Sequence, residues 1–186
     1  MKLDEQTRNL VPGDGELRLV PDAVANPEQL LDRLLAEIDW RQDTGRIMGR
    51  SIALPRLTAW YGDAGYRYSG IDNPPRPWLP LLQELKLAAE SIAGAAFNSV
   101  LANLYRNGRD SMGWHSDDER ALGRDPVIAS LSFGAVRRLR LKHKRDPERR
   151  LGLDLAAGSC LVMAGPLQHH WQHALPKTAR PEGPRV

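Results

Sequence analysis

Apolar side chains in the first half of the chain recur at helical spacing in two places. The first stripe consists of Leu30, Leu31, Leu34, Leu35 and Ile38. It predicts a helix over residues 27–40, with Asn26 as its N-cap and proline at the first helical position. The second stripe consists of Leu81, Leu82, Leu85 and Ala89, and it predicts a helix over residues 78–93. The proline-rich residues 74–77 exclude a helix between the two.

Elsewhere the apolar positions come in short runs that are typical of strands. Residues 45–49 are expected to form a turn, and residues 51–61 have strand character. Further strands are predicted at residues 97–105, 126–133, 137–143, 151–155, 159–164 and 170–175. Helices followed by a series of short strands favour an α+β fold. We expect a double-stranded β-helix (jelly roll) with the N-terminal helices packed on one sheet.

The length of 186 residues suits one domain with its own core. Residues 1–25 are expected to be an N-terminal extension, and residues 26–186 to form a single domain. No apolar run reaches the length of a membrane span, and the first residues lack the apolar core of a secretory signal. Cys160, the one cysteine, is expected to be a buried strand residue. We therefore expect a monomer inside the cell, in the cytoplasm of a bacterium or the nucleus of a eukaryote.

Positive charge is concentrated in one segment of the chain. Residues 137–150 contain eight lysines and arginines against two acidic residues, a net charge of +6. The rest of the chain has 18 basic and 21 acidic residues, a net charge of −3, so the overall charge is +3. A basic patch of this kind is typical of proteins that bind a phosphate backbone. A solvated hairpin with a charged rim would give the same pattern.

His115 and Asp117 are two residues apart, so their side chains point the same way on an extended strand. A second histidine from a distant strand would complete two imidazoles and one carboxylate on one face of a metal ion, the ligand set of non-haem Fe(II) oxygenases. The candidates for it are His169, His170 and His173. Arg185, farther along the chain, could hold a dicarboxylate cosubstrate through a charge-assisted pair. Alone, a pattern this short also arises by chance.

Several blocks around these residues carry a resemblance to a known family. They are NLY at 103–105, GWHSDDER at 113–120, PVIASLSFG at 126–134 and WQHALP at 171–176. Together with residues 55–56 and 61–70, they resemble the AlkB family of nucleic-acid dealkylating dioxygenases, in particular its eukaryotic-type DNA repair branch. The blocks occur in the family's order, and the resemblance covers about residues 45–186.

The resemblance implies a set of iron and cosubstrate residues. His115, Asp117 and His173 would bind Fe(II), and His173 is preferred because it lies in the matching block. His169 is expected on the strand face of His173, and His170 on the opposite face.

Asn103, Tyr105 and Arg185 would contact the cosubstrate 2-oxoglutarate, although Tyr105 taken alone could be an ordinary core tyrosine. The family motif continues to a second arginine six residues beyond Arg185. Because the sequence stops at Val186, we expect it to be truncated at its C-terminus.

The resemblance also implies residues that bind the substrate. A methylated base must leave the duplex to be reached, and Tyr68, with Tyr66 beside it, matches the aromatic that covers such a base. Glu119 could accept a hydrogen bond from a base amine, or it could be a surface glutamate. Ile47 and Met48 match an apolar wedge on a hairpin, where the duplex-acting branch has an aromatic residue. Arg56 is assigned to the same substrate site.

The expected activity is oxidative demethylation of bases such as 1-methyladenine and 3-methylcytosine in DNA, and in RNA as a further substrate. It uses Fe(II), 2-oxoglutarate and dioxygen, and releases formaldehyde, succinate and carbon dioxide. Two alternatives stay open: an oxygenase acting on a protein or a small molecule, and a nucleic-acid binding module without turnover.

Overall fold

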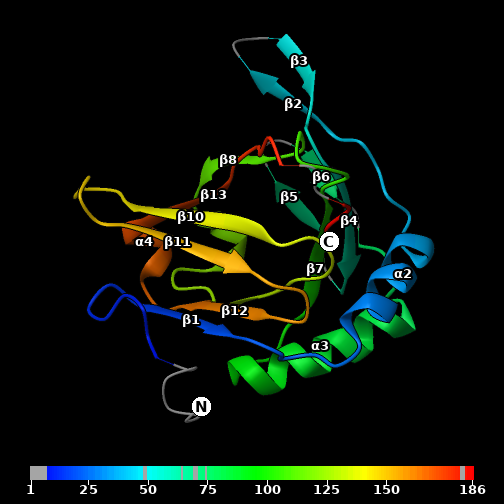
Figure 1. Ribbon diagram of the computed structural model, residues 1–186, viewed down its shortest axis with the longest axis horizontal. Coiled ribbons are helices and arrows are strands. Elements are labelled where there is room, and N and C mark those ends of the chain that lie inside the picture. The colour runs from blue at the N-terminus through cyan, green and yellow to red at the C-terminus, as the bar shows by residue number, and fades with distance from the viewer. Residues whose placement is uncertain (1–7, 48–49, 64, 69–70, 74, 181–182) are drawn as a thin grey trace.

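A computed structural model describes residues 8–47, 50–63, 65–68, 71–73, 75–180 and 183–186 (Figure 1); the side chains of residues 46–50 and 66–74 lie outside this description. Two antiparallel sheets form the body of the molecule, with strand orders β1-β12-β9 and β11-β10-β13-β8. The first contains β1 (Glu16–Val20), β9 (Ile128–Leu131) and β12 (Cys160–Ala164). The second contains β8 (Met112–His115), β10 (Arg137–His143), β11 (Arg150–Leu155) and β13 (Trp171–Leu175). This arrangement agrees with the predicted double-sheet fold.

Three two-stranded sheets complete the strand structure. They pair β2 (Thr44–Ile47) with β3 (Arg50–Ala53), β4 (Leu57–Gly62) with β7 (Ser99–Leu104), and β5 (Tyr66–Tyr68) with β6 (Ile71–Asn73). The β2–β3 hairpin projects from the top of the molecule in Figure 1. The turn expected at residues 45–49 is therefore wrong over Gly45–Ile47, which belong to β2, and the strand expected at 51–61 is broken between β3 and β4.

Helix packing on one sheet agrees with the prediction, since α3 (Pro80–Ala93) covers the three-stranded sheet and α2 (Pro27–Glu37) lies beside α3 (Figure 1). Helix α3 packs against β9 and β12. Helix α2 shares a core with it, in which Leu34 contacts a cluster that includes Leu81 and Phe133. Burial of such side chains contributes about 1.5–3 kcal/mol each. The apolar stripes therefore identified the correct helices and their buried faces.

The ends of both helices differ from the prediction. Asn26 is the N-cap residue and Pro27 the first helical residue, as predicted, but Asn26 has a left-handed backbone (φ 53°) and its side chain makes no capping hydrogen bond. The helix ends at Glu37 because Ile38 is already extended. Helix α3 begins at Pro80 instead of Trp78, since a residue that precedes proline, here Leu79, is disfavoured in the helical region.

Strand β1 lies within the segment that was expected to be an extension. All five of its residues pair with β12, and Leu17 is fully buried in the core. Residues 16–20 thus form an edge of the three-stranded sheet. Cys160, at the start of β12, is buried as predicted, and burial raises the pKa of its thiol to about 11. Among the described residues, no helix is long and apolar enough to cross a membrane.

Candidate metal centre

The two central histidines of the site are brought together by strand pairing. His115, the last residue of β8, is the cross-strand partner of His173 in β13, and their ring centroids lie 4.1 Å apart. Asp117 follows two residues after His115; its carboxylate oxygens lie 3.6 Å from His115 Nε2 and 3.5 Å from His173 Nε2. One potential ligand atom from each residue falls within 4.8 Å of the others. The chain thus places two imidazoles and a carboxylate around one point.

The protonation state of His173 suits the binding of a divalent cation. Burial lowers the pKa of His173 to about 3, with a further contribution from the charge of His115. His173 is therefore neutral at physiological pH, which is the form that binds metals. Nδ1 of His115 lies 2.8 Å from the Gly113 carbonyl; as its donor, it leaves Nε2 free as the ligand atom.

Asp117 is held in an environment that disfavours its charge. Burial raises the pKa of its carboxyl group, and the nearby Glu119 and Asp118 raise it further, although His115 lowers it. A cation bound among these groups would reverse the balance and favour the ionised carboxylate. The donor set of two histidines and one carboxylate fits Fe(II) with open coordination positions.

Neighbouring side chains fix the backbone that carries the triad. Gln168, which is 2% exposed, accepts a hydrogen bond from the Asp117 backbone N–H at 3.0 Å. Ser116 Oγ donates to the Trp171 carbonyl at 2.9 Å. These contacts tie the loop after β8 to Gln168 and to the first residue of β13. Sequence reasoning missed both residues, because neither Ser116 nor Gln168 belongs to a metal-ligand type.

His169 and His170 do not lie on a strand. They belong to the one-turn helix α4 (Leu167–His170), and β13 begins only at Trp171. The expectation that His169 shares a strand face with His173 is therefore wrong. His169 Nε2 lies 2.9 Å from Asp125 Oδ1 at an exposed position. Of the three candidate histidines, His173 is therefore the one that lies beside His115 and Asp117 among the described residues.

Arg185 is a buried cation without a carboxylate partner among the described residues. It is 4% exposed and donates to Ser132 Oγ at 2.7 Å and to the Leu155 and Ala135 carbonyls at 3.0 and 3.4 Å. Burial lowers its pKa to about 10, so it remains charged at neutral pH. A buried charge without a counter-ion is costly. A carboxylate ligand would balance it.

The other two cosubstrate candidates, Tyr105 and Asn103, lie at and just before the segment that pairs with Arg185. Tyr105 pairs with Arg185 through two backbone hydrogen bonds of 2.8 and 2.9 Å. It also packs in the core cluster that contains Leu141, the strand partner of His173. Asn103, in β7, accepts a hydrogen bond from Arg56 Nε at 2.9 Å. Arg56, which was assigned to the substrate site, is itself 4% exposed and contacts this cosubstrate candidate.

Besides Arg56, Glu119 is the predicted substrate residue whose side chain the structure describes. Its Oε2 atom is buried and has no hydrogen-bond partner among the described residues. A buried oxygen of this kind is rare in folded proteins and indicates a missing donor. Met48 and the side chains of Ile47, Tyr66 and Tyr68 lie outside the described residues. On the same hairpin as Ile47, Ile52 is 44% exposed, an apolar residue that the sequence reasoning did not select.

The predicted basic segment forms the β10–β11 hairpin. Its side chains line a hollow of about 450 Å³, whose lining residues are Lys142, His143, Lys144, Arg145, Pro147, Arg150 and Gln172. The cationic lining suits an anion such as phosphate. Arg149 and Arg138 do not contribute free charge, because they pair with Asp14 and Asp154 respectively.

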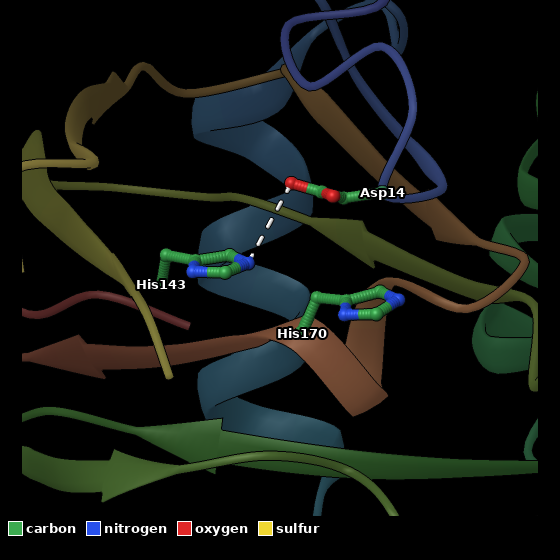
Figure 2. Close-up of side chains that lie close together, drawn as sticks. All are labelled: Asp14, His143 and His170. Atoms are coloured by element: carbon green, nitrogen blue, oxygen red, sulfur yellow. Dashed lines mark ion pairs between the residues drawn. The ribbon is translucent and has the colours of Figure 1, made fainter. Parts of the chain in front are cut away.

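A second group of potential ligands lies beside this hairpin and comprises Asp14, His143 and His170 (Figure 2). One carboxylate oxygen of Asp14 forms an ion pair with Arg149 and accepts a hydrogen bond from Trp171 Nε1 at 3.1 Å. His143 Nε2 lies 3.8 Å from the same oxygen. Nδ1 of His143 accepts the Asp146 backbone N–H at 3.0 Å, so Nε2 carries the proton in the neutral ring. The group is therefore an ion-pair network around Asp14.

Comparison with known proteins is consistent with this geometry. A family model described as the 2OG-Fe(II) oxygenase superfamily matches residues 17–186. The human alpha-ketoglutarate-dependent dioxygenase alkB homolog 3 is 44% identical over 172 residues, which cover 88% of this chain and 60% of that protein. Human DNA oxidative demethylase ALKBH2 is 41% identical over 150 residues, which cover 76% of this chain and 58% of that protein. The chain thus matches about three fifths of the length of these relatives.

The fold has a counterpart among solved structures. The structure of OsALKBH1 superimposes with a TM-score of 0.64 at 14% identity, covering 94% of this chain and 89% of that one. At this identity the likeness concerns the fold alone. Together with the match of the family model to residues 17–186, it confirms the predicted jelly roll.

Proposed function

Because the chain belongs to the 2OG-Fe(II) oxygenase superfamily and, within it, to the AlkB family, we propose that it removes N-methyl groups from nucleic-acid bases by oxidation. The observation that carries this proposal is that the chain combines the triad of His115, Asp117 and His173 with a buried Arg185 that has no carboxylate partner among the described residues. A metal triad alone would suit many reactions, but the buried guanidinium of Arg185 also favours the binding of an anionic cosubstrate.

The residues of the chain divide the work between cofactor and cosubstrate. His115, Asp117 and His173 would hold Fe(II), and Arg185 would pair with a carboxylate of 2-oxoglutarate, with Tyr105 and Asn103 beside it. When bound, iron and 2-oxoglutarate supply the oxidation of an N-methyl group by dioxygen, with succinate, carbon dioxide and formaldehyde as by-products. The protein orients these partners and keeps the site from water.

Glu119 gives the site a means of reading the base. Its unpartnered carboxylate oxygen can accept a hydrogen bond from an exocyclic amine, which both adenine and cytosine carry. We therefore propose 1-methyladenine and 3-methylcytosine as the lesions, in DNA and with RNA as a further substrate. An oxygenase for proteins or small molecules would not need the cationic hollow on the β10–β11 hairpin.

A panel of oligonucleotides, each carrying one lesion, tests the proposal when the products are identified by mass spectrometry. Restoration of 1-methyladenine and 3-methylcytosine, dependent on Fe(II) and 2-oxoglutarate, is the expected result. Asp117→Ala is the control, since it removes a metal ligand and should give no product. Binding of the panel without any turnover would favour the alternative of a non-catalytic binding module.

A second variant addresses how the base is held. Stacking of a base on an aromatic side chain contributes about 1–3 kcal/mol, so Tyr68→Ala is expected to lower kcat/KM on methylated DNA by roughly 5- to 150-fold. Turnover of 2-oxoglutarate without substrate should persist, because the iron ligands are intact. An equal loss of both activities would show that Tyr68 supports the fold and does not stack on the base.

A further inference from the structure

Trp114 is an exposed aromatic residue next to a metal ligand. It is 43% exposed, although it lies in β8, directly before His115. Successive side chains of a strand point to opposite faces. Since His115 points into the molecule toward His173, Trp114 points outward, on the edge strand of the four-stranded sheet. In Figure 1, β8 forms the upper border of that sheet.

A lysine from another strand lies over the indole. Lys142 Nζ is 4.6 Å from the centroid of the Trp114 ring, although β13 separates β10 from β8 in the sheet. This cation–π contact holds an aromatic ring and a positive charge side by side on the outer face. Lys142 therefore helps to orient the indole ring, while almost half of the surface of Trp114 is exposed to solvent.

The same lysine joins Trp114 to the cationic hollow. Lys142 and Gln172 line that hollow together with Arg145 and Arg150, and Lys142 and Gln172 are cross-strand partners in β10 and β13. A continuous surface therefore runs from the aromatic ring beside the metal centre to a concentration of positive charge. Aromatic rings beside a basic groove are the means by which proteins bind single-stranded nucleic acid.

We propose that Trp114 and Lys142 form a platform for a nucleotide that flanks the base under repair. One face of the indole is covered by Lys142, so the flanking base stacks on the other face and its phosphate pairs with the ammonium group. The strand then continues over the outer face of β13 toward the hollow at Arg145 and Arg150. This platform rests on the proposed function, and it would make the chain read nucleotides beyond the lesion itself.

Charge decides between nucleic acid and a protein as the occupant. The hollow beside the platform is lined by lysines and arginines, whereas a protein interface requires a larger apolar core with few charges. A single aromatic residue among cations does not supply such a core. The chemistry that fits is a base with a phosphate attached.

Binding of oligonucleotides by the metal-free protein tests the platform without any turnover. The probes are a 1-methyladenine mononucleotide and single-stranded oligonucleotides with that base at the centre, at the 5′ end or at the 3′ end. Trp114→Ala is expected to weaken binding of the central-lesion oligonucleotide by roughly 5- to 150-fold, the equivalent of about 1–3 kcal/mol. Trp114→Phe should recover most of this loss. Leu87→Ala, which removes a 64% exposed side chain of α3, should change nothing.

Three outcomes would overturn the platform. The first is equal affinity of Trp114→Ala and the unaltered chain for the oligonucleotides. The second is an equal loss of affinity for the mononucleotide and for the oligonucleotides, which would show that Trp114 maintains the structure of the metal site and does not bind a flanking nucleotide. The third is a Trp114→Ala effect on self-association in sedimentation with none on oligonucleotide binding. Failure of the proposed function looks different: the unaltered chain would bind the probes through Trp114 but restore no methylated base.

Discussion

His115 and His173 are cross-strand partners in β8 and β13, and their rings lie 4.1 Å apart. The pairing of these two strands therefore positions both imidazoles of the candidate metal centre, while Asp117 follows on the loop after β8. A site formed on paired strands is held more rigidly than one on loops. The metal centre should consequently exist before the metal binds.

The first prediction concerns the choice of histidine. His173→Ala should abolish Fe(II) binding, because it removes one of three protein ligands from a buried position. His169→Ala is the matched control, since its ring lies by Asp125 at an exposed position. Anaerobic titration with Fe(II) measures both variants. Retention of iron by His173→Ala together with loss in His169→Ala would contradict the ligand assignment.

The second prediction concerns Arg185 and the cosubstrate. Loss of a charge-assisted hydrogen bond costs about 1.5–3 kcal/mol, so Arg185→Ala should weaken 2-oxoglutarate binding by roughly 10- to 150-fold. Ser132→Ala, which removes a partner of Arg185 but keeps the charge, should weaken it less. Calorimetric titration provides the affinities. If Arg185→Ala does not fold, Arg185→Lys keeps the charge but loses the forked geometry; unchanged affinity in a folded variant would rule out this role.

Only some residues of this site could be predicted from the sequence, depending on the kind of interaction that each one makes. The His-x-Asp spacing was sufficient to select His115 and Asp117, whereas His173 was chosen from three candidates by the resemblance of residues 171–176 to the family. Gln168 could not be found, because it accepts a hydrogen bond from a backbone N–H far away in sequence. His169 and His170 were placed on a strand because a short apolar segment does not distinguish a helical turn from a strand by periodicity.

The fold shows a comparable division. The helical stripes and strands β7 and β9 to β13 were predicted, while the C-terminal end of α2 and the start of α3 depended on the backbone conformations at Ile38 and Leu79. Strand β1 was missed although its signal was present, since Leu17 and Leu19 alternate with polar residues. Its pairing with β12 joins segments at opposite ends of the chain, which local patterns do not reveal.

The third prediction concerns the basic hairpin. Arg145→Glu and Arg150→Glu should weaken DNA binding irrespective of sequence. The log–log salt dependence should flatten by about one unit for every phosphate that the variant no longer neutralises. Arg149 is left unaltered because it pairs with Asp14. Arg109→Glu, at an exposed position without an ion pair among the described residues, is the control for charge reversal alone. If the hairpin variants keep the salt slope of the unaltered chain, the hollow is a solvated rim.

The fourth prediction concerns the network around Asp14. Burial raises the pKa of its carboxyl group, but hydrogen bonds from Arg149 and Trp171 and the charges of Arg149 and His143 outweigh burial and lower it overall. A carboxylate with a depressed pKa stabilises the folded state above its unfolded pKa of about 3.9. This stability is lost as the pH falls through the folded value.

Asp14→Asn should therefore unfold at lower denaturant concentration at pH 7, with the difference from the unaltered chain shrinking below about pH 4. The variant should bind as much iron as the unaltered chain, because this network is not a metal site. Chemical denaturation at several pH values and an iron titration measure the two properties. A constant difference at all pH values, or a loss of one equivalent of iron, would contradict this assignment.

The most direct test of the account is the ratio of succinate formed to methylated base restored, measured in one reaction with a 1-methyladenine oligonucleotide. If the triad of His115, Asp117 and His173 drives demethylation, the ratio should be about one, as the stoichiometry of these oxygenases requires, and both products should vanish in Asp117→Ala. Succinate formation that does not respond to the methylated base, or base restoration that survives Asp117→Ala, would contradict it.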